Sequence, residues 1–259
     1  MPLSDTRLRF ALRFLEPWRR YVRPVFVGME RVPVHTRPLL FVGNHTLYGV
    51  LDVPLLFAEL YARHGIFPHA LGDHVPFRIP GWRAVISSFG VVDGTRENAA
   101  RLLSRGEPVL VFPGGGREVA KRKGEKYALL WKERLGFARL AIEHGATIVP
   151  FSAVGAEEAY DIAYDANDLF ASLLGPLARR LPVRDAVWFP LSLGLAGTPF
   201  PKRERFYFEI GHPIDARRYG ADAQEANCRA LRDEARHAVQ QGIDSLLALR
   251  HSDPARYVP

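Results

Sequence analysis

Cysteine is almost absent from this sequence, because Cys228 is the only one among its 259 residues. A chain with one cysteine cannot form an internal disulfide, so the fold depends on a packed core and the expected compartment is reducing or indifferent. Cys228 lies in a charged stretch with helical spacing, which argues against a thiol nucleophile.

Long hydrophobic runs are also missing. No uninterrupted apolar stretch reaches the roughly 20 residues that a membrane-spanning helix needs. The N-terminus lacks the apolar core of a cleavable export signal. We therefore expect any contact with a membrane to be peripheral.

Several motifs of other enzyme classes do not occur. Gly114 to Gly116 are not followed by Gly-Lys-Ser/Thr, and no Gly-x-Gly-x-x-Gly opens a helix after the first strand, which disfavours nucleotide-binding folds. Neither Ser152 nor Ser192 lies in a Gly-x-Ser-x-Gly elbow, which disfavours a serine acyl-enzyme. Three histidines, His64, His69 and His74, are regularly spaced by five residues. This spacing places them on one face of neither a helix nor a strand, so no metal site is expected.

The segment from Phe41 to Asp52 is the most informative one present. An apolar run ends at Asn44 and His45, and Asp52 follows seven residues after the histidine. Histidine titrates near neutral pH, so His45 could take a proton from a hydroxyl while Asp52 holds its ring in one tautomer. The alternative is a hydrogen-bonded pair with a structural role only.

A glycine-rich segment, 112–118, follows a second apolar run at 108–112. In sheets flanked by helices, sites are assembled where strands end, so chemistry is favoured at both loops. Backbone N–H groups of Gly114 to Gly116, which have no Cβ to block approach, are candidates for binding an oxyanion. Arg117 fits a phosphate or the anionic end of a donor, or else an ion pair with a nearby acid such as Glu118.

Four segments occur in a fixed order along the chain: Asn44-His45, Gly90–Arg96, Phe112–Glu118 and Ile148–Phe151. A longer stretch, Trp131–Phe151, combines a helix, its glycine stop and a strand at fixed offsets. This pattern resembles the glycerolipid acyltransferase superfamily, and within it the diacylglycerol acyltransferase and phytyl ester synthase-like branch. The resemblance covers residues from about 37 to 215.

The resemblance implies His45 as general base, Asp52 as its partner, and substrate contacts from residues of the motif loops: Asn44, Arg96, Gly114, Gly115, Gly116, Arg117 and Glu118. Two positions depart from the family pattern. The usual histidine-to-acid spacing points to Val50, so Asp52 comes two residues late. Gly114 stands where the lysophosphatidic acid branch carries a glutamate, which favours an uncharged alcohol acceptor.

The implied reaction is acyl transfer from acyl-CoA or an acyl carrier protein to the hydroxyl of a glycerolipid or long-chain alcohol. It needs no cofactor besides the donor, and no covalent intermediate is expected, since no serine or cysteine nucleophile is credible. One alternative is acylation of lysophosphatidic acid, which Arg117 permits. Another is a peripheral lipid-binding protein without catalysis.

The net charge of +7, from 35 basic and 28 acidic residues, suits nucleic acid, anionic lipid or coenzyme A. Its placement favours lipid over nucleic acid, because residues 1–23 combine arginines, a tryptophan and a tyrosine with leucines at helical spacing. We expect 1–23 to be an amphipathic membrane-associating helix, on the cytoplasmic side of a membrane. The alternative is an ordinary helix that packs its leucines on the core.

Two later segments have the same pair of interpretations. Residues 186–201 are apolar and uncharged but are broken by prolines, so they cannot span a membrane as a helix. If exposed, they form a large apolar patch that needs a partner, and otherwise they form a buried loop and strand. Residues 169–180 have the spacing of an amphipathic helix that ends in arginines.

The remaining pattern alternates short apolar runs with helical spacing, which predicts one layered α/β domain, 24–259, with a mostly parallel sheet. Thr95 and Gly106 mark the start and stop of one helix, Gly145 ends another, and 223–250 predicts a helix pair split near Gly242. Strands are expected at 38–43, 67–71, 90–92, 108–112, 147–153 and 205–210.

Overall fold

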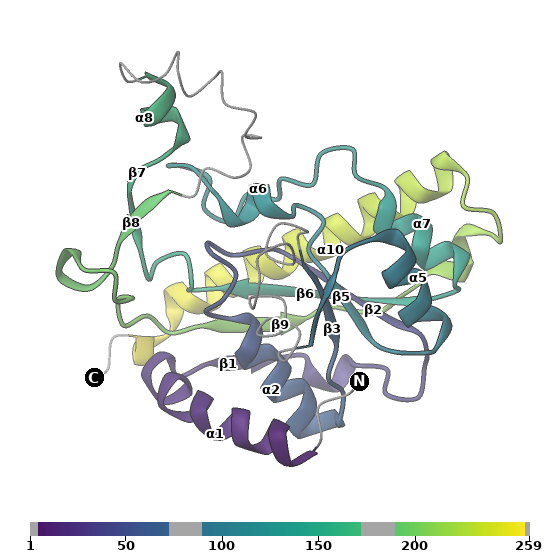
Figure 1. Cartoon of the computed structure of the whole chain (residues 1–259), viewed down its shortest axis with the longest axis horizontal. Helices are drawn as coiled ribbons and strands as arrows, with labels where there is room; N and C mark the ends of the chain where they lie inside the picture. The colour runs from purple at the N-terminus through teal and green to yellow at the C-terminus, as the bar shows by residue number, and fades with distance from the viewer. Residues whose placement is uncertain (1–4, 73–89, 172–189, 257–259) are drawn as a thin grey trace.

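A computed structural model describes residues 5–72, 90–171 and 190–256 (Figure 1). In these ranges the chain forms a mixed α/β domain around an eight-stranded sheet, with a separate two-stranded sheet, β7–β8. The strands are β1 Val25–Val27, β2 Leu39–Gly43, β3 His69–Gly72, β4 Val91–Asp93, β5 Val109–Val111, β6 Thr147–Val154, β7 Asp161–Tyr164, β8 Leu191–Leu193, β9 Tyr207–Ile210 and β10 Ile214–Asp215. The α-helices are α1 Asp5–Val22, α2 Val53–His64, α5 Arg96–Ser104, α6 Gly116–Val119, α7 Gly136–Glu143, α8 Ala166–Ala171 and α10 Glu225–Ser252.

The main sheet has the order β1-β9-β6-β2-β5-β3-β4, and β10 pairs with β6 outside this path. Strands β6, β2, β5, β3 and β4 are mutually parallel, whereas β9 and β10 pair antiparallel with β6. This confirms the predicted α/β domain with a mostly parallel sheet. All six strands predicted from the sequence are present within one or two residues of their expected bounds.

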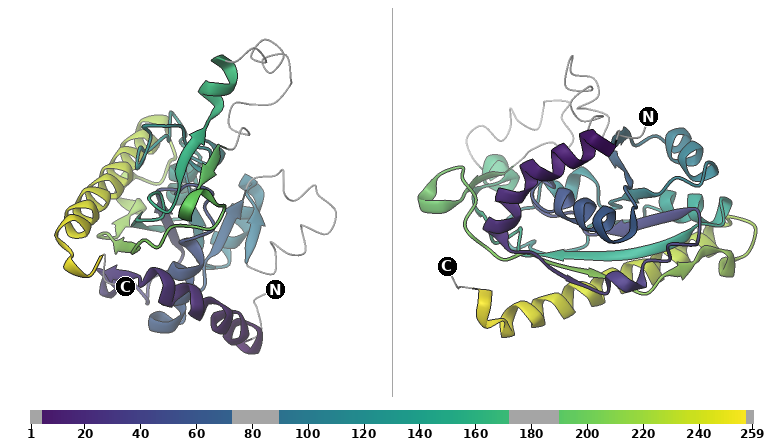
Figure 2. Two further views of the ribbon diagram at one scale, coloured as in Figure 1. Left: turned by 90° about the vertical axis from the view of Figure 1, so that its left-hand side faces the viewer. Right: turned by 90° about the horizontal axis from the view of Figure 1, so that it is seen from below.

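Side chains of the central strands alternate between two cores, one on each face of the sheet. In β2, Leu40 and Val42 pack with α5, α7 and α10, whereas Leu39 and Phe41 pack with α2 and the end of α1. Figures 1 and 2 show the sheet between these two helical layers. The central strands are therefore buried on both faces, and polar chemistry is left to their ends.

The C-terminal segment forms one helix, α10, rather than the predicted pair split at Gly242. A Cβ on Gly242 would lie 2.5 Å from Ser152 Oγ, and that hydroxyl donates to the carbonyl of Val239 at 2.8 Å. The glycine thus permits close packing of α10 on β6 and does not end the helix.

The C-terminal half of α1 is docked on the domain. Trp18 Nε1 donates to the carbonyl of Leu51 at 2.8 Å, Arg19 pairs with Glu59 at 2.8 Å, and Val22 is fully buried. Leu15 and Trp18 of this half also pack on the buried cluster, and membrane association of residues 1–23 stays a prediction. Within the described ranges, none of the helices combines the length and apolar character needed to cross a bilayer.

Candidate functional site

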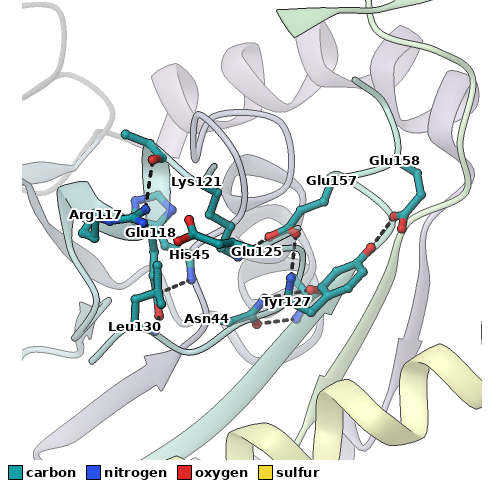
Figure 3. A network of polar contacts seen from close by, with 12 residues as sticks. Asn44, His45, Arg117, Glu118, Lys121, Glu125, Tyr127, Leu130, Glu157 and Glu158 are labelled. Atoms are coloured by element: carbon teal, nitrogen blue, oxygen red, sulfur yellow. Dashed lines mark hydrogen bonds and ion pairs between the residues drawn. The ribbon is translucent and has the colours of Figure 1, made fainter. Parts of the chain in front are cut away.

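The candidate site lies at the carboxyl ends of three adjacent parallel strands. His45 follows β2, the glycine-rich loop 112–118 follows β5, and Glu157 and Glu158 follow β6 (Figure 3). Because β2 lies between β5 and β6, the three loops meet at one edge of the sheet. The sequence prediction that the two motif loops come together is consistent with this arrangement.

The His45 ring is held on two sides. It stacks on Phe112 with ring centroids 4.0 Å apart and an interplanar angle of 24°. Gly49 lies against its Cε1 edge, where a Cβ would stand 1.7 Å from Cε1. Neither contact was predicted from the sequence. Phe112 and Gly49 lie near the ends of the two motifs, and nothing else in the sequence indicates that they touch the His45 ring. The ring orientation is therefore set by packing.

Burial lowers the pKa of His45 to about 3, and the nearby positive charge of Lys121 acts in the same direction. The imidazole is consequently neutral at physiological pH, which is the state of a proton acceptor. Its Nδ1 is buried and has no hydrogen-bond partner among the described residues.

The hydrogen bond expected between His45 and Asp52 is not formed. Asp52 is 3% exposed, and its Oδ1 accepts the backbone N–H of Val53 at 2.9 Å at the start of α2. This is the geometry of a helix N-cap, and burial raises the pKa of the carboxyl. The catalytic role of Asp52 stays a prediction.

Glu118 holds the site loops together from inside. Its two carboxylate oxygens accept the backbone N–H groups of His45 at 2.9 Å and Leu130 at 2.8 Å, and its side chain is fully buried. A Cβ on Gly114 would fall 2.0 Å from Glu118 Cδ, so the glycine makes room for this carboxylate. These two contacts give Glu118 a structural role in the site loops, and its contact with substrate stays a prediction.

Asn44 is likewise held by structural hydrogen bonds, and its contact with substrate stays a prediction. It is 1% exposed, and its side chain both donates to the carbonyl of Ala153 and accepts the N–H of Ala153, each at 2.9 Å. The bonds join the end of β2 to β6, which fixes the position from which His45 projects.

The two arginines of the motifs are engaged by acids. Arg117 donates to the carbonyl of Ala120 at 3.1 Å and pairs with Glu125, so the ion-pair alternative is realised with an acid other than Glu118. Arg96 pairs with Glu143 at 2.6 Å on the surface. Neither contact directs a guanidinium at His45.

A buried polar network borders the site, and no local pattern in the sequence predicts it. Lys121 and Glu157, each 2% exposed, form an ion pair, and Glu157 also accepts the N–H of Tyr127 at 2.7 Å. The Tyr127 hydroxyl donates to Glu158 and accepts the N–H of Gly155 at 3.0 Å (Figure 3). Lys121 belongs to a run of basic residues beyond the glycines, but its charge faces inward.

The described ranges hold no group of three His, Cys, Asp or Glu side chains placed to bind a metal ion. His64 contacts the carbonyl of Met29 at 2.9 Å, and His69 lies 3.9 Å from Glu107. His74 lies outside the described residues, as does most of the segment 169–180.

The fold and the site define a class of α/β proteins in which a neutral histidine at one strand end faces a glycine-rich loop from the neighbouring strand. The chain belongs to the Acyltransferase family, whose model matches residues 23–154. This family of enzymes is the one that the motifs resemble.

Three relatives are informative. Phytyl ester synthase 1, chloroplastic, of Arabidopsis thaliana is 33% identical over 251 residues, which cover 89% of this chain and 35% of that protein. The "DGAT1/2-independent enzyme synthesizing storage lipids" of Gallus gallus is 32% identical over 176 residues, covering 67% of this chain and 51% of the relative. Phytyl ester synthase 2, chloroplastic, of Arabidopsis thaliana is 29% identical over 247 residues, covering 85% of this chain and 34% of that protein. This chain thus spans about a third of the length of the two plant synthases.

Among solved structures, the 1-acyl-sn-glycerophosphate (LPA) acyltransferase PlsC of Thermotoga maritima has a TM-score of 0.54 at 16% identity. The match covers 95% of this chain and 85% of that one. At this identity the likeness concerns the fold alone.

Proposed function

We propose that the protein is an O-acyltransferase that moves a fatty acyl group from a thioester to the hydroxyl of a neutral glycerolipid or long-chain alcohol. The observation that carries this proposal is the His45 ring, which is neutral and fixed at a strand end beside a glycine-rich loop. Membership in the Acyltransferase family supports it.

In the proposed reaction, His45 accepts the proton of the acceptor hydroxyl as the oxygen attacks the thioester carbonyl. The carbon–sulfur bond then breaks, and the proton passes from the imidazole to the departing thiolate, so that an ester and a free thiol leave. No covalent enzyme intermediate is required. The low pKa of His45 favours return of the proton to the leaving group.

The glycine loop supplies candidates for oxyanion stabilisation. The N–H of Gly115 already donates to the carbonyl of Phe112 at 2.9 Å. In the described structure, no hydrogen bond engages the N–H groups of Gly114 and Gly116. We therefore assign the developing negative charge to these two donors.

The engaged state of Arg117 argues for an uncharged acceptor. Its guanidinium is 14% exposed and is already paired with Glu125, so binding an acceptor phosphate would require that pair to break. The names of the plant synthases and of the storage-lipid enzyme point to neutral products. Acylation of lysophosphatidic acid is the less favoured acceptor choice.

The donor is an acyl-CoA or an acyl carrier protein, and the lipid acceptor places the reaction at the cytoplasmic surface of a membrane, with peripheral attachment. The basic excess of the chain suits both the phosphates of such donors and an anionic lipid surface. No further cofactor enters this scheme.

The test is acyl transfer by purified wild-type and His45→Ala protein. Each is incubated with long-chain acyl-CoA, and then with the acyl thioester of acyl carrier protein, as donor. The acceptors are monoacylglycerol, diacylglycerol, lysophosphatidic acid, phytol and a fatty alcohol, and products are identified by mass spectrometry. We expect a neutral ester with the wild type and a loss of at least about 100-fold with the variant.

Two outcomes would count against the proposal. An ester formed equally by both proteins would remove His45 from the chemistry. The absence of any ester from both donors, with lipid binding retained in both proteins, would favour the non-catalytic lipid-binding protein.

A further inference from the structure

The small sheet β7–β8 has a reversed pattern of exposure. Leu191 and Leu193, on one face of β8, are 63% and 37% exposed, whereas Ser192 between them points inward and is 9% exposed. Its hydroxyl has no hydrogen-bond partner among the described residues. A sheet face that contacts water normally has polar residues outside and apolar residues inside. This face instead exposes leucines, next to Asp161, which is opposite Leu193 in the sheet and forms an ion pair with Lys202.

The exposed apolar face extends beyond β8. Tyr164 of β7 pairs with Leu191 across the sheet and is 40% exposed. After β8 the chain turns, and the backbone N–H of Leu195 donates to the carbonyl of Phe200 at 2.7 Å, so these two residues lie next to each other in the backbone. They are 50% and 55% exposed. We call these five side chains the apolar ridge: Tyr164, Leu191, Leu193, Leu195 and Phe200.

The apolar ridge has basic and aromatic residues at its border. The Phe200 ring lies 5.6 Å from the Tyr21 ring of α1, and the exposed Arg203 lies over that tyrosine at 6.0 Å. An arginine beside an aromatic ring and a leucine surface matches the depth profile of a lipid interface, with headgroup phosphates outside and acyl chains inside.

The apolar ridge is also connected to the site loop. The hydroxyl of Tyr48, three residues after His45, donates to the carbonyl of Pro190 at 2.8 Å, directly before β8. Tyr48 also packs its ring on Tyr160, directly before β7, at 5.6 Å. Figures 1 and 2 show β7 and β8 projecting from the main sheet on the side to which this loop leads.

We propose that the apolar ridge docks the protein on a lipid bilayer containing anionic lipid, with Arg203 at the headgroups. The choice of a bilayer as occupant rests on the proposed function, whose acceptor is a membrane lipid. Attachment through β7–β8 brings the loop that carries His45 to the lipid surface. The expected attachment of residues 1–23 is a separate contact.

The test is cosedimentation with vesicles of phosphatidylcholine, with and without phosphatidylglycerol, in the absence of acyl donor. We expect Leu191→Asp/Leu195→Asp to bind vesicles at least about tenfold more weakly than wild type. Leu193→Asp and Leu249→Asp form a matched pair, because both leucines are 37% exposed and only Leu193 belongs to the apolar ridge. Leu193→Asp should weaken binding, and Leu249→Asp, on α10, should not.

Arg203→Gln should reduce the preference for vesicles that contain phosphatidylglycerol. Circular dichroism melting checks that the variants fold, which exposed positions should permit. Unchanged vesicle binding by Leu191→Asp/Leu195→Asp would overturn the proposal. The proposal would also fail if light scattering showed a wild-type dimer that these substitutions dissociate while vesicle binding persists. The apolar ridge would then contact a second copy of the chain and not a bilayer.

Vesicle binding needs no acyl transfer, so the two proposals fail separately. A protein that binds vesicles through the apolar ridge and forms no ester supports the docking surface and contradicts the enzyme. A protein that forms an ester but binds vesicles without the apolar ridge supports the enzyme and contradicts the docking surface.

Discussion

At the scale of single residues, Gly49 is the sharpest constraint on the proposed base. Its φ is +63°, and a Cβ there would overlap the His45 ring. Gly49→Ala must therefore displace the ring, and we expect at least about a 100-fold loss of acyl transfer. Gly65→Ala is the control, because Gly65 has φ +65° with nothing near its Cβ position. Equal activity of the two variants would show that ring placement is unimportant.

Glu118 is expected to act through the position of His45. In Glu118→Gln an amide N–H would face one of the two backbone N–H groups that the carboxylate now accepts, which should cost about 1–3 kcal/mol of stability and lower kcat. Glu59→Gln is the control, because Glu59 is also buried but is bound by Arg19 and Arg63. It should lower stability without a matching effect on kcat, as measured by urea unfolding and steady-state kinetics. Similar kcat losses in both variants would assign Glu118 a general structural role.

The lowered pKa of His45 has a consequence for stability. In the unfolded chain His45 binds a proton below its ordinary pKa of 6.5, whereas in the folded chain it stays neutral down to about pH 3. The free energy of unfolding therefore falls as the pH drops from about 6.5 to about 3. Between about pH 7 and about pH 5, wild type should lose about 2 kcal/mol more than His45→Asn. Urea unfolding at both pH values checks this, and parallel losses would contradict the burial of a neutral ring.

Sequence reasoning at this scale located the loops better than the roles of their residues. It singled out His45 and the glycines because motif spacing is a local property. It assigned Asn44 and Glu118 to substrate, since nothing local reveals that these side chains hydrogen-bond to Ala153 and Leu130. Contacts between residues far apart in the chain carry no such signal.

At the scale of elements, α10 depends on its contact with β6. Gly242→Ala gains helix propensity of about 1 kcal/mol but places a Cβ 2.5 Å from Ser152 Oγ, so we expect net destabilisation. In a Ser152→Ala background the same substitution should cost less or become stabilising. Thermal unfolding of the four proteins measures this coupling, which we expect to exceed about 1 kcal/mol. Additive effects would mean that the helix shifts freely along the strand.

Prediction of elements succeeded where burial dictates the pattern. The central strands are buried on both faces and read as continuous apolar runs, and Thr95 caps α5 by accepting the N–H of Asn98 at 3.1 Å. Strands β1, β7 and β10 were missed, and none of them lies in the middle of the main sheet. Strand β8 lies within 186–201, for which a strand was one of the two interpretations left open. Gly242 was misinterpreted because a packing glycine and a helix stop look alike in sequence.

At the scale of the whole molecule, the mostly parallel sheet and its two helical layers were predictable from the alternation of apolar runs. The reversed exposure of β7–β8 was not, because a short apolar segment gives the same sequence pattern whether it is buried or faces a partner. The sequence left both interpretations of residues 186–201 open, and the described part of that segment is largely exposed.

The antiparallel pairing of β9 with β6 and the packing of α10 along it have a consequence for folding during synthesis. His45, the glycine-rich loop and Glu157 all lie in the first 158 residues. However, β6 has no β9 beside it and no α10 on one face until residues 207–252 have left the ribosome. Domains generally fold as units. The nascent chain thus carries every proposed site residue for some time before α10 can pack on β6.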